Sequence, residues 1–203
     1  MIMRMFKTIF ASFLLLIAAQ GFCAKKEITI NKENGQITWK GKKFTGEHVG
    51  KVEIAKGNLK FEMGELRGGT INVDMRSLNN SDITDKEYNA KLVNHLKSED
   101  FFSTEKFPTA KFEITSVMPA KGATYDVKGN LTIKGITKPA SLKVNRSEEK
   151  DSFKYQGNLV FDRTDYNIKF KSKKFFESIG DKVIYDEVSL NIEFNVAKKL
   201  LKN

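Results

Sequence analysis

The chain has 203 residues and carries 35 Lys and Arg against 25 Asp and Glu, which gives a formal net charge of +10. With 30% charged and 40% hydrophobic residues, the composition argues against both an integral membrane protein and a disordered chain. The single cysteine excludes an internal disulfide. These numbers indicate a soluble, basic, globular protein with one domain or two small ones.

The N-terminus has the pattern of a secretory signal peptide. Arg4 and Lys7 precede an apolar run over residues 9–19, and small residues follow. The run is too short to span a bilayer, and the order charged, apolar, small is typical of a cleaved export peptide. We predict a signal peptide over residues 1–24, cleaved between 19 and 24, and an exported domain over residues 25–203, periplasmic or else secreted. An N-terminal membrane anchor is the alternative, and lipid attachment at Cys23 is disfavoured because Phe22 stands where a small residue is needed.

The exported domain alternates apolar and polar residues with a period of two, which is the pattern of strands with one buried face. The clearest case is the segment 188–196, where Val188, Leu190, Ile192, Phe194 and Val196 share one parity. Cleavage after Ala24 removes the only cysteine, so a hydrophobic core must hold the domain together in an oxidising compartment. About eight to ten strands joined by short turns predict an all-β fold, an antiparallel sandwich or closed barrel.

The other alternating segments follow the same pattern along the whole domain. Their apolar members are Ile28 and Ile30; Ile37 and Trp39; Val52 and Ile54; Leu59 and Phe61; Ile71, Val73 and Met75; Phe112 and Ile114; Tyr125 and Val127; Leu131 and Ile133; Leu142 and Val144; Phe153, Tyr155, Leu159 and Phe161.

One segment predicts a helix, roughly from Thr84 to Lys97. Asp82 or Thr84 would cap its start, and Tyr88, Leu92 and Leu96 recur at a spacing of four. We expect this helix to lie across the barrel or to plug one end. The aromatic segment 98–112 that follows is expected to pack under the helix or over a barrel mouth.

A Gly-Asn-Leu pattern begins at Gly57, Gly129 and Gly157. Each glycine shares parity with the apolar residues and is expected to face inward. A glycine inside a strand permits a bend and leaves space beside the wall of a cavity, and a simple bulge or hairpin corner is the alternative.

Several motifs together resemble the YceI-like family of secreted bacterial lipid- or polyisoprenoid-binding proteins. They are ITWKG at 37–41, GEHVG at 46–50, VDMRSL at 73–78, NHLKSEDFF at 94–102, KFPTAKF at 106–112, VKGNLTIKGITKP at 127–139 and FDRTDYNI at 161–168. They span most of the exported domain in the family's order. One departure is Asn167, where the family often has Gly, and it puts the local turn in doubt.

The resemblance implies an extended, lipocalin-like antiparallel β-barrel with one short α-helix, whose apolar interior holds a polyisoprenoid, an isoprenoid quinone or another long-chain lipid. The expected role is non-enzymatic binding, storage or transport without a cofactor. A structural or stress-related interaction module with a side-chain-filled barrel is the alternative. The inward parity set gives these candidate ligand-binding residues: Trp39, His48, Phe61, Val73, Phe112, Tyr125, Gly129, Ile133, Tyr155, Gly157, Phe161, Arg163, Leu190 and Phe194.

Three of these residues have a second interpretation. His48 and Arg163 fall at inward parity at strand ends, where either could hold a polar head group. For His48 a satisfied structural role is the stronger interpretation, and for Arg163 it is a buried ion pair or a turn contact involving Asp162 or Asp165. Trp39 is expected to pack in the core first and to touch a ligand second.

Catalytic and metal sites are not indicated. His48 and His95 are the only histidines, and neither belongs to a cluster with metal-ligand spacing. The sequence has no nucleophile elbow, Walker loop or dinucleotide fingerprint. A hydrolase using paired carboxylates stays open but unsupported.

The basic charge has three interpretations. Nucleic-acid binding is disfavoured because the chain is exported. A solvated outer face is the default, since Lys40, Lys60, Lys111, Lys128 and Lys143 have outward parity. Attraction to an anionic membrane surface is the third, and each Lys or Arg near such a surface is worth about 1 kcal/mol. A closed barrel offers no free sheet edge, so a monomer is the default oligomeric state.

Overall fold

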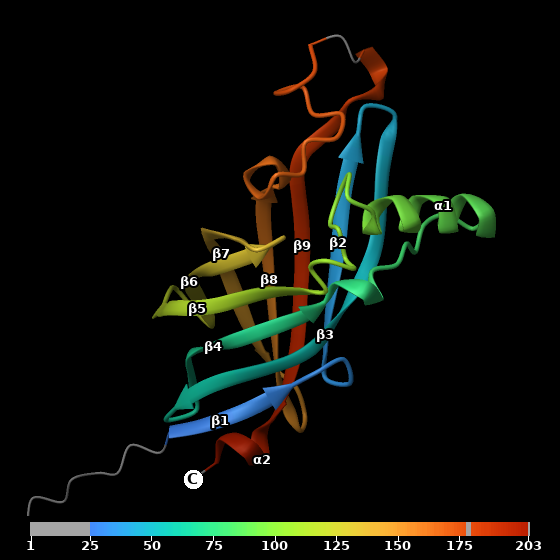
Figure 1. Cartoon of the computed structure of the whole chain (residues 1–203). Helices are drawn as coiled ribbons and strands as arrows, with labels where there is room; N and C mark the ends of the chain where they lie inside the picture. Colours follow the sequence, from blue (N-terminus) through green and yellow to red (C-terminus); the bar gives the residue numbers. More distant parts are fainter. Residues whose placement is uncertain (1–24, 178–179, 203) are drawn as a thin grey trace, which may run out of the picture.

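The computed structural model describes residues 25–177 and 180–202 (Figure 1). The predicted signal peptide lies outside the described residues. The described residues form nine strands: β1 (Lys25–Ile30), β2 (Gly35–Lys43), β3 (Gly46–Glu62), β4 (Glu65–Asp74), β5 (Thr109–Pro119), β6 (Thr124–Ile133), β7 (Ile136–Glu148), β8 (Ser152–Asp162) and β9 (Ile184–Ala197). The helices in this part of the chain are α1 (Lys86–Lys97), the single turn α2 (Lys198–Leu201) and the three short 3₁₀ helices η1 (Met75–Ser77), η2 (Arg163–Tyr166) and η3 (Gly180–Lys182).

The strands form a closed antiparallel barrel. The hydrogen-bonded order is β3-β2-β9-β8-β7-β6-β5-β4, and β4 pairs again with β3. The long strand β3 serves two neighbours on one edge: its first half pairs with β2, from Ile37 opposite Val52 to Lys43 opposite Gly46. Its second half pairs with β1, from Ile30 opposite Gly57 to Lys25 opposite Glu62. The predicted strand count and the predicted barrel are both confirmed.

The period-two patterns place the core inside the barrel. On β9 the side chains of Ile192, Phe194 and Val196 are buried, as the alternation predicted. The three predicted inward glycines, Gly57, Gly129 and Gly157, are also buried. The space beside each is taken up by a neighbouring side chain, because a Cβ atom at Gly57 would meet Ile30, at Gly129 Phe112, and at Gly157 Leu142.

One end of the barrel is filled by aromatic and charged side chains. Tyr155 is fully buried and stacks on Phe194 with ring centroids 4.9 Å apart, and Phe61 meets Tyr155 edge-on at 6.0 Å. Beside them, Glu65 accepts hydrogen bonds from the Tyr125 hydroxyl and, at 2.8 Å, from Arg146. This end of the barrel is therefore closed.

Helix α1 begins two residues later than the sequence predicted. Its N-cap is Asp85, whose carboxylate accepts a hydrogen bond from the Tyr88 backbone N–H at 2.9 Å. Asp82 and Thr84 were wrong as cap candidates. Asp82 instead accepts a hydrogen bond from the Val49 backbone N–H on β3 at 2.7 Å, which draws the segment before the helix onto the barrel wall.

The helix lies beside the barrel, alongside β2 and β3 (Figure 1). None of its residues is buried, and Tyr88 is 66% exposed. Across residues 25–177 and 180–202, none of the helices has the length and apolar character that a membrane crossing requires.

Candidate ligand cavity

A cavity of about 610 Å³ occupies the half of the barrel opposite the closed end. It is partly open, and most of its wall is apolar. All the barrel strands from β2 to β9 except β7 contribute, together with α1, the aromatic segment after it and the connection from η2 to β9. Its apolar wall includes Ile37, Val52, Ile71, Val73, Met75, Leu78, Leu92, Leu96, Phe101, Phe102, Leu131, Ile133, Leu159, Phe161, Phe170, Val188, Leu190 and Ile192.

The inner end of the cavity is a floor made by Ile71, Phe112 and Ile192. These three side chains line the large cavity and also a separate void of about 30 Å³ behind it. Gly157, Phe194 and Leu66 line that smaller void but not the large cavity. The floor therefore separates the open half of the barrel from the filled half.

Trp39 forms one side of the cavity and is held in place by a backbone contact. Its indole Nε1 donates a hydrogen bond to the Asn79 carbonyl at 3.1 Å. The ring lies over Gly50, where an added Cβ atom would come within 1.9 Å of the Asn79 oxygen and 2.6 Å of the ring. Only glycine fits at position 50, so the residue pair fixes the indole against β3. Trp39 is therefore a core residue and a cavity residue at once.

His48 also lines the cavity and is paired with Asp82. The distance from Nδ1 to the Asp82 carboxylate is 2.8 Å. Because an ionised carboxylate only accepts, Nδ1 carries a proton and donates to it, and in the neutral tautomer with this hydrogen bond Nε2 is the acceptor nitrogen. Burial raises the pKa of Asp82, but hydrogen bonds from Val49, His48 and Asn80 outweigh it and hold that pKa below its usual value.

Helix α1 supplies a second histidine to the wall. His95 Nε2 lies 2.9 Å from the Asp100 carboxylate. Its ring meets Phe101 and Phe170 edge-on, with centroids 5.0 and 4.7 Å away. The predicted packing of the aromatic segment beneath the helix is confirmed by Phe101, which is buried and joins His95 in the cavity wall.

The outer part of the cavity wall is basic. Lys42 and Lys43 come from the end of β2, and Lys171 and Lys182 come from the connection between η2 and β9. No carboxylate among the described residues lies within 4.0 Å of any of these four ammonium groups. Although Asp181 lines the same part of the cavity, these lysines make the net charge positive where the cavity approaches solvent.

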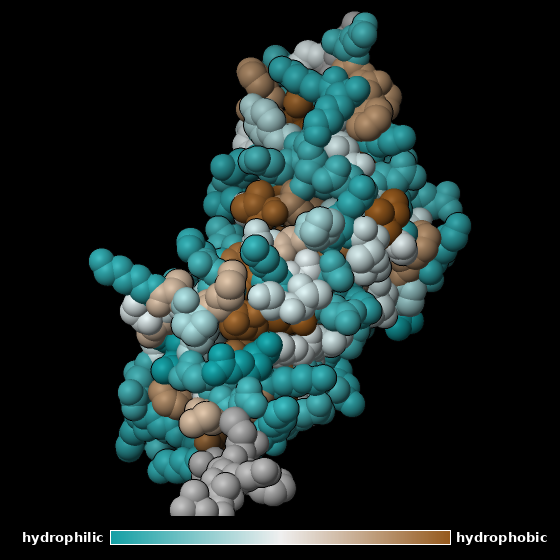
Figure 2. All heavy atoms as spheres, turned by 90° about the vertical axis from the view of Figure 1, so that its left-hand side faces the viewer, coloured by the Kyte–Doolittle hydropathy of each residue, from teal (hydrophilic) through white to brown (hydrophobic). Residues whose placement is uncertain are grey.

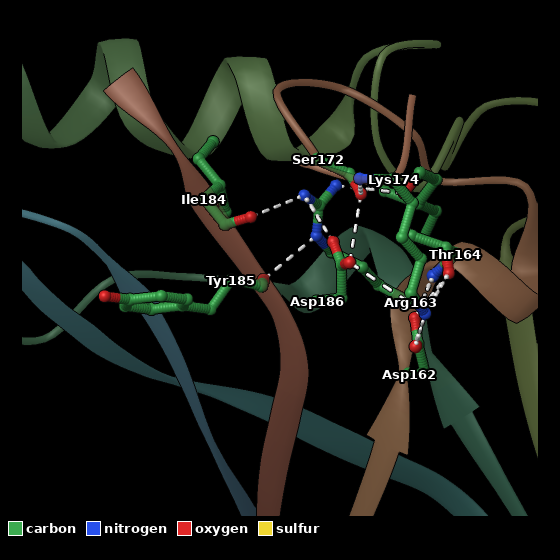
Figure 3. A network of polar contacts seen from close by, with 9 residues as sticks. Asp162, Arg163, Thr164, Ser172, Lys174, Ile184, Tyr185 and Asp186 are labelled. Carbon is green, nitrogen blue, oxygen red and sulfur yellow. Dashed lines mark hydrogen bonds and ion pairs between the residues drawn. The ribbon is translucent and has the colours of Figure 1, made fainter. Parts of the chain in front are cut away.

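Arg163 anchors this connection from inside the protein (Figure 3). Its guanidinium donates to the carbonyls of Ile168 and Ile184, both at 2.9 Å, and to that of Tyr185 at 3.1 Å. It also lies 3.1 Å from the Asp186 carboxylate. Burial lowers the pKa of Arg163, and Asp186 partly offsets this effect. The buried ion pair expected for Arg163 is present, with Asp186 as the partner in place of Asp162 or Asp165.

Neighbouring polar groups complete the network around Arg163. Ser172 donates a hydrogen bond to Asp186 at 3.0 Å, and Lys174 pairs with Asp162. Asn167, which follows η2, has a φ of 59° and a ψ of 31°. Asparagine tolerates this left-handed conformation better than most residues, so Asn167 can occupy a position whose backbone also suits glycine.

Half of the candidate binding residues line the cavity and half do not. The cavity wall contains Trp39, His48, Val73, Phe112, Ile133, Phe161 and Leu190. The structure places the other seven away from it: Phe61, Tyr125, Gly129, Tyr155, Gly157, Arg163 and Phe194. All but Arg163 of this second set lie toward the filled end of the barrel or behind the floor, whereas Arg163 is committed to its carbonyl and Asp186 contacts.

Sequence reasoning missed the basic wall residues Lys42, Lys43, Lys171 and Lys182 and the helix residue His95. Parity or a place in loops hides the four lysines, and the pairing of the β2 end with the start of β9, where Lys43 lies opposite Ile184, brings their segments together. Within the described part of the chain, no three or more His, Cys, Asp or Glu residues are grouped as a metal site would require.

Comparison with known proteins gives a consistent family. The profile of the YceI-like domain matches residues 28–196. A UPF0312 protein of Shewanella denitrificans is 30% identical over 127 residues, which cover 60% of this chain and 64% of that protein. The match thus spans slightly less than two thirds of that relative's length.

Two solved structures have the same fold. BcnA of Burkholderia cenocepacia superposes with a TM-score of 0.64 at 21% identity, covering 80% of this chain and 96% of that one. A polyisoprenoid binding domain from Saccharophagus degradans, implicated in plant cell wall breakdown, superposes with a TM-score of 0.59 at 12% identity, covering 84% and 98%. At these identities the likeness shows the fold alone.

Proposed function

The chain belongs to the YceI-like domain family, and from that premise we propose that it binds a polyisoprenoid or similar long-chain lipid in the barrel cavity. The observation that carries the proposal is the apolar cavity of about 610 Å³. This volume falls within the range of about 300–1,000 Å³ typical of small-molecule sites. The structural neighbour described as a polyisoprenoid binding domain supports the same ligand class.

The composition of the wall favours a hydrocarbon chain. Each methylene removed from water into this wall gains about 0.8 kcal/mol, so about ten methylenes gain roughly 8 kcal/mol before the costs of association. Such a ligand needs no specific polar contact along its length. Selection then depends on its cross-section and on the distance from the mouth to the floor at Ile71, Phe112 and Ile192.

The polar part of the ligand is expected near the outer half of the cavity. In the tautomer that donates to Asp82 through Nδ1, the Nε2 atom of His48 can accept a hydrogen bond from a head-group hydroxyl. Lys42, Lys43, Lys171 and Lys182, which form no ion pair within the described part of the chain, lie toward the same opening and favour a head group with negative charge or exposed carbonyl oxygens.

The proposed role is non-enzymatic and belongs to the cell envelope. Within the described residues, each histidine is hydrogen-bonded to an aspartate. Neither is hydrogen-bonded to a serine or threonine hydroxyl, which a hydrolase with a histidine-activated hydroxyl nucleophile requires. The signal-like pattern of residues 1–24 supports export. Fractionation of cells producing the full chain tests the location: protein retained in the cytoplasm with its first residues uncleaved would contradict it.

Native mass spectrometry with lipid extraction tests binding directly. Protein purified from cells should carry lipid or should take up a polyprenol or isoprenoid quinone added in detergent. Leu190→Trp fills the cavity and should abolish uptake, because Leu190 lies in the wall. Val160→Trp is the matched control, since Val160 is 49% exposed on the adjacent strand and faces away from the cavity. Wild-type protein that neither carries nor takes up lipid would contradict the proposal.

An interaction module is the second candidate function, and the filled end of the barrel around Tyr155 favours it. The same experiment separates the two candidates. If the protein is an interaction module, the folded wild type should carry and take up no lipid. Both tryptophan variants should then show the same lack of lipid uptake.

A further inference from the structure

Two segments far apart in sequence meet at the open end of the barrel. One is the turn between β2 and β3, and the other is the connection from Lys169 to Val183 (Figure 1). The Phe44 backbone N–H donates a hydrogen bond to the Val183 carbonyl at 3.0 Å. Lys43 lies opposite Ile184 in the sheet. We call the described residues of these segments, 42–45, 169–177 and 180–183, the tip.

The tip exposes aromatic side chains. Phe44 is 59% exposed, Phe175 46% and Phe176 48%, and these are the three exposed phenylalanines of the described chain. Figure 2 shows hydrophobic side chains at this upper end of the molecule, set among hydrophilic ones. Burying such rings in protein is the general rule, so three at one end indicate a surface that meets an apolar partner.

The same segments are strongly basic. They contain seven lysines, at positions 42, 43, 169, 171, 173, 174 and 182, against the two carboxylates of Glu177 and Asp181. The Lys169 ammonium lies 4.8 Å from the ring centre of Phe175, and that of Lys171 lies 5.2 Å from Phe170. Aromatic rings beside long cationic side chains match the interface of a bilayer, where rings enter the acyl boundary and ammonium groups meet anionic head groups.

The tip is also built to keep its shape and its position. Arg163 ties the connection to β9 through the carbonyls of Ile184 and Tyr185, and Ser172 reaches Asp186 on the same strand. The cavity wall includes Lys42, Lys43, Lys171 and Lys182 of the tip, whereas the opposite end of the barrel is filled. A membrane in contact with the tip therefore faces the cavity.

From the aromatic rings, the lysines and their place at the cavity mouth, we propose that the tip is a docking surface for an anionic lipid bilayer. Phe44, Phe175 and Phe176 enter the interface, and the lysines bind the anionic head groups. Charge complementarity selects the bilayer as the partner, since a neutral surface would leave six of the seven lysines without a counter-charge among the described residues, Lys174 alone being paired with Asp162. The docked orientation presents the cavity mouth to the bilayer.

Vesicle co-sedimentation tests this surface with variants that leave the cavity wall intact. The vesicles contain phosphatidylcholine alone or phosphatidylcholine mixed with phosphatidylglycerol. Wild-type protein should bind only the mixed vesicles, and added salt should weaken that binding because it screens exposed charges. Lys169→Gln with Lys173→Gln should lower the partition coefficient roughly thirtyfold. Phe44→Ser with Phe176→Ser should lower it as well.

Matched controls come from exposed residues outside the tip. Lys128→Gln with Lys138→Gln removes the same charge from the barrel wall, and Met63→Ser with Val160→Ser removes exposed apolar side chains from the β3–β4 turn and from β8. Both controls should bind mixed vesicles as the wild type does. Equal binding of tip variants and wild type would overturn the proposal, as would equal losses in tip variants and controls, or wild-type binding to neither vesicle.

Lipid uptake from detergent, measured by native mass spectrometry on the same variants, separates this proposal from the proposed function. Tip variants should take up lipid from detergent as the wild type does. Vesicle binding by wild-type protein that takes up no lipid would support the docking surface and contradict the cavity function.

Discussion

The ring of Phe112 occupies the space that a side chain at Gly129 would need. A Cβ atom at position 129 would lie 2.6 Å from the ring and 2.4 Å from the Glu113 carbonyl oxygen. The two residues sit on neighbouring strands β5 and β6, so the glycine leaves room for the ring that forms part of the cavity floor.

Gly129→Ala should therefore destabilise the protein by about 1–3 kcal/mol, because neither the backbone carbonyl nor the packed ring can move freely. Urea denaturation followed by tyrosine and tryptophan fluorescence measures the change. Gly41→Ala is the matched control, since a Cβ atom there would meet nothing within 4 Å. Its effect should stay within about 0.5 kcal/mol. Equal stability of the two variants would contradict the role assigned to Gly129.

Phe112→Ala should join the cavity to the void of about 30 Å³ behind the floor. The substitution should cost about 3–5 kcal/mol of stability, as truncation of a buried aromatic residue usually does. It should also shift the bound ligands toward longer chains, because the floor no longer stops the chain end. Native mass spectrometry on a mixture of polyprenols of graded length measures the shift. An unchanged length distribution in the folded variant would show that the floor does not set the length.

His48→Leu tests the polar contact at the cavity wall. The substitution keeps an apolar side chain in place of the ring but removes Nε2 and frees Asp82 of its partner. Binding of a polyprenol should weaken by about tenfold, the worth of one hydrogen bond, while binding of the matching hydrocarbon without the hydroxyl should not change. Competition between the two ligands, read by mass spectrometry, makes the comparison. A parallel loss for both ligands would assign His48 a structural role only.

Alternation predicted which face of each strand is buried but not how far along the barrel each residue lies. Leu159 pairs with Leu190 at the cavity, and Tyr155 pairs with Phe194 at the filled end. These pairs share the same two strands and the same parity, and they are separated by about 13 Å along the barrel. A single sequence contains no signal for that distance, because the barrel end is set by pairing between strands.

Contacts between distant segments explain why the structure differs from the sequence-based predictions for Asp82 and Arg163. Asp82 has the chemistry of a helix cap, yet the backbone N–H of Val49 and the ring of His48 bind it across more than thirty residues of chain. Asp186, the partner of Arg163, lies on β9, whereas the sequence suggested the local carboxylates of Asp162 and Asp165. Local patterns favour neighbours in sequence, and the closed barrel brings in partners from other strands.

The Arg163–Asp186 pair should show energetic coupling. Arg163→Met leaves three backbone carbonyls without their donor and a largely buried carboxylate without the nearer of its two cationic partners, so it should destabilise the protein by about 3–5 kcal/mol. In the double variant with Asp186→Asn, the loss should be smaller than the sum of the single losses by about 0.5–3 kcal/mol. Urea denaturation of all four proteins gives this cycle. Additive losses would mean that the carbonyl contacts alone hold Arg163.

Glu65 should make the closed end of the barrel sensitive to acid. Burial raises the pKa of Glu65, but hydrogen bonds from Tyr125 and Arg146 and the charges of Arg146 and Arg67 outweigh it, so the pKa in the folded protein lies below 4.5. A carboxyl whose pKa falls on folding stabilises the native state above its unfolded pKa, and this contribution is lost as pH falls through the folded pKa.

Glu65→Gln removes this titration while it keeps the shape of the side chain. The free energy of unfolding of the wild type should exceed that of the variant by a constant amount above about pH 5, and the difference should shrink as the pH falls below 4.5. Tyr125→Phe, which removes one donor to Glu65, should retain part of the pH dependence because Arg146 still binds the carboxylate at 2.8 Å. Urea denaturation at a series of pH values measures all three proteins. A difference that does not change between neutral and acidic pH would show that Glu65 is ionised equally in the folded and unfolded states.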